Sequence, residues 1–184
     1  MAIEKLKSEV QEIWELFRET DKRMRETDER MKETDKKIEK LSESVQALTG
    51  KWGKFVESLV VPALPKMLGE RGIEVDRIFQ RVRAQKEGKE MEVDILAVDT
   101  EYAVLVEAKS TLKVEDVREH IERLDSFKEF FPEYRDRKVA GAVAGIVIEE
   151  DADKFAYRQG LFVITQTGET AQILNDDSFQ PRLW

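Results

Sequence analysis

A heptad pattern runs through the N-terminal part of the chain and limits its fold more than any other feature. With position a placed at Ile3, alternating spacings of three and four residues continue without a slip to Leu48. The a positions are Ile3, Val10, Phe17, Met24, Met31, Ile38 and Val45, and the d positions are Leu6, Ile13, Thr20, Thr27, Thr34, Leu41 and Leu48. This period winds helices left-handed around a shared seam, and a lone helix would leave the apolar stripe in water. Residues 1–49 are therefore predicted to form a coiled-coil oligomerisation helix.

Charges beside the seam predict the orientation of the helices. Within the seven-residue repeat over residues 18–38, position g is basic and position e is acidic, with Arg23, Arg30 and Lys37 against Asp21, Asp28 and Asp35. In a parallel pair, each g residue faces the following e residue of the partner, so Arg23 meets Asp28. We therefore expect a parallel homo-oligomer held through this helix.

The number of strands in the coiled coil is less constrained. Ile and Val at the a positions with Leu at the terminal d positions favour a dimer. Threonine at three central d positions, and the apolar Trp14 and Leu16 beside the seam, favour three or four strands. Of these, we favour the dimer. The alternative to an oligomer is a helix that folds back on the globular domain of its own chain.

The composition excludes several classes of function. The 184 residues include 31 Lys and Arg against 39 Asp and Glu, a net charge of −8, so the chain does not coat nucleic acid through bulk electrostatics. With no cysteine and one histidine, disulfides, thiol catalysis, zinc fingers and multi-histidine metal sites are excluded. Any metal would have oxygen ligands. The longest apolar run, Val139–Ile148, is far shorter than the roughly 20 residues that span a bilayer, so a soluble, cytoplasmic protein is expected.

The remaining residues, 50–184, carry the pattern of an α/β domain. A helix is predicted over residues 51–68, set apart from the heptads by Thr49 and Gly50 and bent or shortened by Pro62 and Pro65. Strands are predicted over residues 73–85, 89–98, 102–109, 139–148 and 161–165, and helices over 114–131 and 151–159. An antiparallel meander followed by a helical crossover makes a mixed sheet flanked by helices.

Acidic residues interrupt the second and third predicted strands, whose neighbouring residues are apolar. Alternation along a strand places Glu92 with Asp94 on one face, and Glu107 with Lys109 on one face of the next strand. Carboxylates at the edge of a core are costly unless a cation or hydrogen bonds offset their burial. Converging on one point, they would make an oxygen-ligand site for a hard divalent cation, with an amine beside it.

This pattern resembles the PD-(D/E)XK nuclease superfamily, which has the restriction-endonuclease-like fold. The matching residues are Asp94, twelve intervening residues, and then Glu107-Ala108-Lys109, on the second and third strands of an α-β-β-β-α-β order. Glu57, on the preceding helix, matches an acidic residue of many members, whereas Val93 stands where a proline is expected. The resemblance covers residues 51–165 and implies an αβββαβ domain with a mixed central sheet.

The resemblance also implies metal-dependent hydrolysis of phosphodiester bonds in nucleic acid. Asp94 and Glu107 would bind Mg²⁺ or Mn²⁺ together with the carbonyl of Ala108. Glu57 would support a water or a second metal position, and Lys109 would orient or activate the attacking water. The alternative for Asp94, Glu107 and Lys109 is a structural ion-pair cluster, and for Glu57 a solvated position on its helix.

Further polar residues are weaker candidates. Ser110, directly after the motif, could donate to a phosphate or cap the next helix. Gln159 stands on the late helix from which many superfamily members add a polar residue, with helix capping as the alternative. The basic residues of the first hairpin could meet a phosphate backbone or form a charged outer face; they are Arg77, Arg81, Arg83, Lys86 and Lys89. His120 is expected on the exposed side of its helix.

Two hypotheses of function follow. The first is a nuclease whose coiled coil pairs catalytic domains. The second is a catalytically inactive nuclease-fold module that binds nucleic acid or protein, with valency set by the coiled coil. The sequence favours neither DNA nor RNA, so the type of nucleic acid stays open.

Overall fold

A computed structural model describes the backbone of residues 2–149, 151–168 and 170–184, and the side chains of residues 14, 16–41, 53–149, 151–168 and 170–184. The chain divides into two compact units, Met1–Leu48 and Thr49–Trp184. The heptad side chains before Trp14 and after Leu41 lie outside the described residues. Among the helices that are described, none is long and apolar enough to cross a membrane.

The first unit contains the N-terminal part of helix α1, and the whole helix extends over Ala2–Gly69, so its last residues belong to the second unit. Its a-position side chains are exposed in the single chain, where Phe17, Met24, Met31 and Ile38 are between 60% and 64% exposed. The threonines at d donate their hydroxyls, at 2.8 Å, to the carbonyl four residues earlier in the helix. Because these hydroxyls are satisfied internally, the threonines can turn their methyl groups to a partner helix without leaving a polar group unpaired.

Helix α1 differs from the prediction where a break was expected. Helical conformation continues through Thr49 and Gly50, and Pro62 and Pro65 lie inside the helix and do not shorten it. Each proline removes one hydrogen bond to the carbonyl four residues before it. Both prolines are exposed, so these carbonyls are on the side of the helix where water can replace the missing donor.

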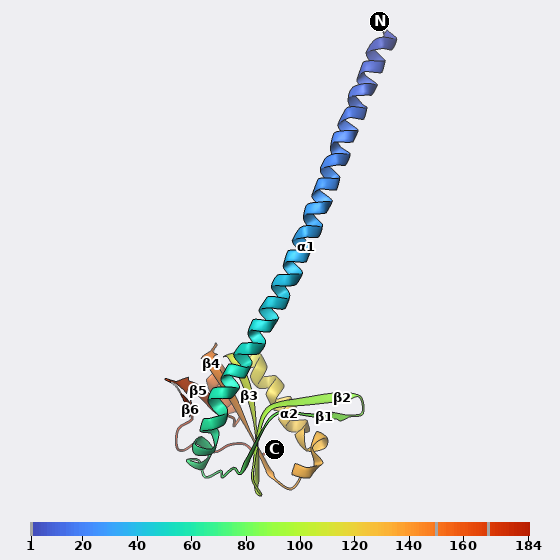
Figure 1. Ribbon diagram of the computed structural model, residues 1–184. Coiled ribbons are helices and arrows are strands. Elements are labelled where there is room, and N and C mark those ends of the chain that lie inside the picture. Colours follow the sequence, from blue (N-terminus) through green and yellow to red (C-terminus); the bar gives the residue numbers. More distant parts are fainter. Residues whose placement is uncertain (1, 150, 169) are drawn as a thin grey trace. The chain divides into compact units, whose positions relative to one another are not determined.

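The second unit is built on a six-stranded sheet in which spatial order follows chain order (Figure 1). Strands β1 to β3 and β5–β6 pair antiparallel, whereas β3–β4 and β4–β5 pair parallel. The strands are β1 Arg77–Lys86, β2 Lys89–Val98, β3 Tyr102–Leu112, β4 Lys138–Ile148, β5 Phe162–Thr167 and β6 Thr170–Ile173; the helices are α2 Val114–Phe130, η1 Pro132–Tyr134 and α3 Ala152–Arg158. The predicted α/β class and mixed sheet are confirmed, and the first elements follow the expected αβββαβ order. Strand β6 and the short helix η1 were not predicted.

Helices cover the sheet on both faces. The α1 face is packed by Val60, Leu64 and Leu68 against apolar residues of β2 to β5. The opposite face is packed by Leu124 and Phe127 of α2 and by alanines of α3. Strands β3 and β4 are therefore buried on both sides, which accounts for their nearly continuous apolar sequence.

The β1–β2 hairpin exchanges its two faces at Arg81 and Asp94, which stand opposite each other. On β2, Val93 lies in the same apolar cluster as Leu96, whereas Ile95 lies in the cluster on the α1 face. An uninterrupted strand would keep Val93 and Ile95 on one face. The paired register skips Arg81 and Asp94, and Arg81 has a φ of 54°, a left-handed conformation that costs a non-glycine residue about 1 kcal/mol or more. The side chains of both strands thus switch faces at one point, a half-turn of the hairpin, and that point is at Asp94, one of the predicted site residues.

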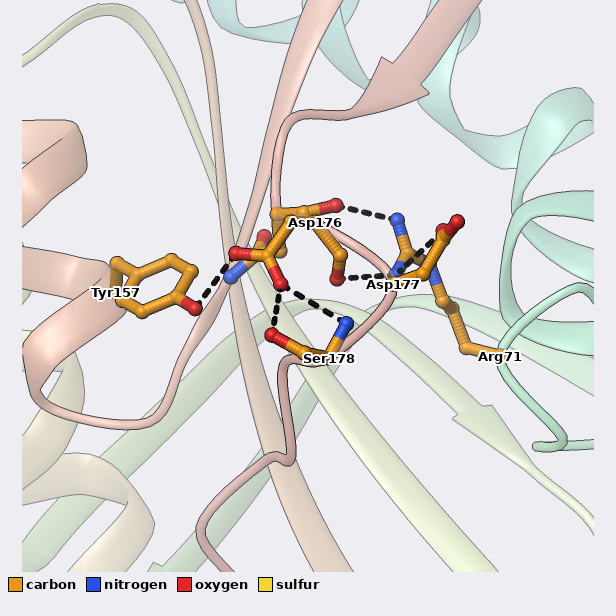
Figure 2. Close-up of polar contacts among 6 residues, drawn as sticks. Arg71, Tyr157, Asp176, Asp177 and Ser178 are labelled. Carbon is orange, nitrogen blue, oxygen red and sulfur yellow. Dashed lines mark hydrogen bonds and ion pairs between the residues drawn. The ribbon is translucent and has the colours of Figure 1, made fainter.

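The C-terminal segment is fastened to the second unit by polar contacts (Figure 2). Arg71 donates to the carbonyls of Asn175 and Asp176, and Tyr157 on α3 donates to the Asp176 carboxylate at 2.7 Å. Hydrogen bonds from Ser178 and then Tyr157 lower the pKa of Asp176 to about 2. These contacts have a structural explanation and need no ligand.

Asn175 is the buried member of this segment, and replacing it tests how much the segment contributes to stability. Its side chain accepts from the Val163 amide at 2.7 Å and donates to the Leu161 carbonyl at 3.1 Å, so it extends the pairing of β5. Asn175→Ala leaves two buried backbone groups unpaired and is expected to lower the free energy of unfolding by about 2–4 kcal/mol. Urea denaturation measures the loss. Asp177→Ala, which removes an exposed carboxylate 3.5 Å from Arg71, should change it by less than about 0.5 kcal/mol; an equal effect of both variants would contradict the prediction.

Candidate active site

The candidate site begins where strands β2 and β3 separate. Their paired register runs from Val98–Ala103 to Ile95–Val106 and stops there. Asp94 is the next residue of β2, and its carboxylate oxygen Oδ2 accepts a hydrogen bond of 2.9 Å from the amide of Ala108. The side chain of Asp94 therefore makes the next hydrogen bond to β3, where the backbone pairing of the two strands has ended.

Glu107 and Lys109 lie on one face of β3, as alternation predicts. Lys109 Nζ is 3.0 Å from Glu107 Oε1, and Arg123 Nη2 of helix α2 is 2.6 Å from Glu107 Oε2. Lys109 also lies 3.6 Å from Asp116 Oδ1 at the start of α2. Glu107 is buried, so both of its oxygens face cations rather than water. The structure thus brings Asp94, Glu107 and Lys109 together.

Burial dominates the electrostatics of the two carboxylates. Desolvation raises the pKa of Asp94, the charge of Glu57 adds to this rise, and the Ala108 amide opposes it. Desolvation also raises the pKa of Glu107, followed by repulsion from Asp94, while Arg123 and Lys109 act in the opposite direction. The ionised forms of both carboxylates are therefore disfavoured even with their cationic neighbours present. A further cation would stabilise these ionised forms.

The lysine of the site stays protonated at neutral pH. Burial lowers the pKa of Lys109, but the charge and hydrogen bond of Glu107, with Asp116 and Asp94, outweigh burial and raise it above its ordinary value. A permanently charged ammonium cannot act as a base at neutral pH. Lys109 can donate hydrogen bonds and stabilise negative charge.

Glu57 of α1 is buried and pairs with an arginine of the hairpin. Arg81 Nη2 and Nε lie 2.9 and 3.4 Å from its two carboxylate oxygens. The alternative that Glu57 occupies a solvated helix position is therefore wrong, because Glu57 is buried and Arg81 of the hairpin supplies its counter-ion. The charge of Glu57 still acts on Asp94, which places it at the edge of the same cluster.

Two charged residues of the site, Asp116 and Arg123, were not singled out by the sequence, and Arg81 was considered only as a phosphate contact or part of a charged outer face, not as a partner of Glu57. On α2, Asp116 and Arg123 are seven residues apart and flank the buried stripe that contains Val117 and Leu124, a spacing that could have indicated a shared face. Arg81 carries no such signal. Its contact with Glu57 depends on a left-handed residue within a strand, which pattern analysis does not anticipate.

The remaining candidates, Ala108, Ser110 and Gln159, have different surroundings. Ala108 is buried, and its amide, rather than its side chain, holds Asp94. Ser110 is half-buried on β3, and Gln159 caps α3 through its own amide, which donates to Phe155 and Ala156. Among the described residues, no hydrogen bond or ion pair joins the side chain of Ser110 or Gln159 to the cluster.

His120 is buried rather than exposed, so the prediction for this residue is wrong. It is 2% exposed, and its Nε2 lies 3.3 Å from the Leu105 carbonyl. Burial, followed by the charge of Arg123, lowers the pKa of His120 to about 3 and keeps the ring neutral. It belongs to the stripe of α2 residues that pack on β3, one turn from Leu124.

A groove of about 770 Å³ lies beside the cluster, between the outer part of the β1–β2 hairpin and α2. Arg123 lines this groove as well as contacting Glu107. The other charged residues of its lining are six glutamates and two lysines. Arg83 of the hairpin, one of the predicted phosphate contacts, is paired with Glu92 across the ladder at 2.7 Å. The groove is therefore acidic overall.

The oxygen donors of the site suit some coordination arrangements of a divalent cation and not others. Among the described residues, no group of three or more His, Asp or Glu side chains is arranged to hold a metal. Mg²⁺, however, is usually bound through one or two carboxylates and keeps several waters. Asp94 and Glu107 provide two desolvated carboxylates with raised pKa values. These residues therefore fit a hard cation held by two carboxylates, and not one held by a three-acid cage.

Comparisons with known families identify two matches. The model of "Domain of unknown function (DUF8196)" matches residues 60–173, a segment that includes Asp94, Glu107 and Lys109. The model of "Protein of unknown function (DUF3782)" matches residues 4–95, which include the heptads. No curated protein matches the chain.

Two solved structures are similar to part of the chain. A repair endonuclease from Pyrococcus abyssi aligns with a TM-score of 0.42 and 21% identity, over 58% of this chain and 45% of its own. The structure of an EndoMS–dsDNA2 complex aligns with a TM-score of 0.38 and 18% identity, over 60% of this chain and 44% of its own. The chain thus spans less than half the length of either protein.

Proposed function

Because the chain belongs to the DUF8196 and DUF3782 families, whose functions are unknown, we propose its function from its own site: metal-dependent hydrolysis of phosphodiester bonds in nucleic acid. The observation that carries this proposal is the cluster at the separation of β2 and β3. The half-buried carboxylate of Asp94 and the buried carboxylate of Glu107 repel each other there, beside the charged Lys109. This combination suits an anionic substrate brought together with a cation.

The residues that would hold Mg²⁺ or Mn²⁺ are Asp94 and Glu107, with the main-chain carbonyl of Ala108. Bound there, the ion would supply positive charge against the negative charge that develops on the phosphoryl oxygens. The carboxylates would gain from it because their pKa values show incomplete compensation by Arg123 and Lys109. The Ala108 amide fixes one oxygen of Asp94 and so sets the direction of the other.

Lys109 and Arg123 are the residues proposed to interact with the substrate. Lys109 remains an ammonium, so its role is to orient the attacking water and to stabilise the phosphoryl group, rather than to remove a proton. Arg123 Nη2 is buried, 2.6 Å from Glu107 Oε2. The side chain as a whole is 27% exposed and lines the groove, so its other N–H groups could meet a phosphate.

A second candidate function is a non-catalytic module on the same fold. The observation that favours it is the internal pairing of the acids, since Glu57 and Glu107 already have arginine partners. The acidic groove also opposes a nucleic acid in that position. In this case, the cluster would be a structural ion-pair network that holds α1, β3 and α2 together.

Cleavage assays distinguish the two functions. We expect the purified protein to cleave at least one of supercoiled plasmid, single-stranded DNA, branched DNA and RNA in Mg²⁺ or Mn²⁺, and none in EDTA. Asp94→Asn should reduce the rate by about two orders of magnitude or more. Glu92→Gln is the matched control because Glu92 lies on the same strand but pairs with Arg83, and it should retain activity. Equal residual cleavage by the native protein and Asp94→Asn would indicate a contaminant and favour the non-catalytic module.

A further inference from the structure

The pairing of Glu57 with Arg81 bears on how many cations the site can hold. Arg81 binds this carboxylate side-on, with Nη2 and Nε each facing one oxygen. Glu57 is 6% exposed, so water does not compete for it. One guanidinium thus engages both oxygens of Glu57, whereas Asp94, the proposed ligand on β2, has only Oδ2 engaged among the described residues, by the amide of Ala108. Resting on the proposed function, we propose that the site binds one divalent cation rather than two, and that Arg81 takes the place of the second.

The charges of the cluster agree with a single cation. Four acids and three bases belong to it: Glu57, Asp94, Glu107 and Asp116, with Arg81, Lys109 and Arg123. The cluster alone therefore has one excess negative charge. One divalent cation together with one phosphodiester anion would make it neutral, whereas a second divalent cation would leave two uncompensated positive charges. Uncompensated charge is costly in a partly buried site.

The backbone at Arg81 supports a specific role for its side chain. A residue at φ 54° is accommodated best by glycine, yet an arginine is present. A strained conformation persists where the surrounding structure determines it, and such positions cluster at functional sites. Here the left-handed turn aims the guanidinium at Glu57, across from Asp94. Arg83, two residues later in β1, has regular geometry and pairs outside the cluster with Glu92, so the two arginines form a natural comparison.

Manganese binding to the full-length protein tests the inference without relying on activity. Titration followed by electron paramagnetic resonance should give one bound Mn²⁺ per chain. Glu57→Gln should leave that number unchanged, with affinity within about threefold, whereas even an outer-shell partner of a metal typically costs tenfold or more. Asp94→Asn should remove binding. Two Mn²⁺ in the native protein, falling to one in Glu57→Gln, would overturn the inference.

Freeing Glu57 provides the complementary test. Arg81→Gly removes the guanidinium and suits the left-handed backbone, so a second Mn²⁺ should bind, and the double variant Arg81→Gly with Glu57→Gln should bind one again. Arg83→Ala removes the same charge from the same strand and should bind one. A single Mn²⁺ in Arg81→Gly would overturn the role of Arg81. If the Arg81→Gly variant fails to fold, the number of Mn²⁺ bound by Glu57→Gln still tests the inference. No Mn²⁺ in the native protein would instead refute the proposed function, so the two failures are distinguishable.

Discussion

Lys109→Ala is expected to reduce the rate of phosphodiester cleavage by about a hundredfold or more, the scale for loss of one group that stabilises a transition state. The lysine contributes charge next to Glu107 at a point where negative charge would develop on the substrate. Metal binding should persist, or become tighter, because removal of the ammonium takes a like charge away from the cation. Turnover under saturating metal measures the first effect, and the rise of melting temperature with Mg²⁺ measures the second.

Lys113→Ala is the control for this variant. Lys113 is close in sequence, is more than half exposed and pairs with Glu149 at 3.5 Å, outside the cluster. Its replacement should leave both turnover and the metal-dependent rise in melting temperature unchanged. If Lys109→Ala lost metal binding together with activity, the lysine would be an organiser of the carboxylates and not a group that acts on the substrate.

Deletion of residues 1–48 is expected to convert an oligomer into a monomer. The apolar stripe from Trp14 to Leu41 is exposed in the single chain, an arrangement that a second copy of the helix would bury. Asp21, Asp28 and Asp35 take part in no ion pair within the described part of the chain, whereas Arg23 and Lys37 pair with Glu19 and Glu33. The second unit has its own core on both faces of the sheet, so it should fold after the deletion. Light scattering measures the mass; an unchanged oligomer would contradict the prediction.

Charge exchange tests the parallel orientation. A variant with arginine at Asp21, Asp28 and Asp35 should associate poorly with itself, since both flanks of the seam are then basic. A variant with glutamate at Arg23, Arg30 and Lys37 should also associate poorly, and a mixture of the two should recover the native mass. Each contact contributes only a few tenths of a kcal/mol, so the effect depends on their sum. An antiparallel pair would set basic against basic and acidic against acidic positions in the native protein, so the native protein would then associate as poorly as either variant and only the mixture would associate well.

The fold could be predicted from the sequence because its signals are local. The heptads, the alternating apolar residues of the strands and the turn at Glu87-Gly88, where both residues have positive φ, each depend on neighbours a few positions away. The length of α1 was harder to predict. Prolines end helices when they remove a buried hydrogen bond, and at Pro62 and Pro65 the affected side is exposed. Strand β6 is only four residues long and has no alternation of its own to detect.

The candidate site was predictable in part for the same reason. Asp94, Glu107 and Lys109 are conspicuous because charge interrupts apolar strands. Their counter-ions were not predictable, since Arg81 contacts Glu57 across 24 positions of sequence and Arg123 contacts Glu107 from another element. His120 was assigned to the wrong side of its helix. A single polar residue in an amphipathic pattern does not reveal whether the core offers it a hydrogen-bond partner, which here is the carbonyl of Leu105.

The half-turn at Arg81 and Asp94 also has a consequence for the register of the β1–β2 hairpin. In an ordinary antiparallel ribbon, a slip of two residues keeps every side chain on its face, so only one-residue slips are strongly penalised. Here both strands exchange faces at opposed positions. A slip of two residues would separate the two exchange points and remove Met91 or Val93 from the core. The position that supplies the predicted metal ligand therefore also fixes the alignment of the two strands, and with it which hairpin residues line the acidic groove.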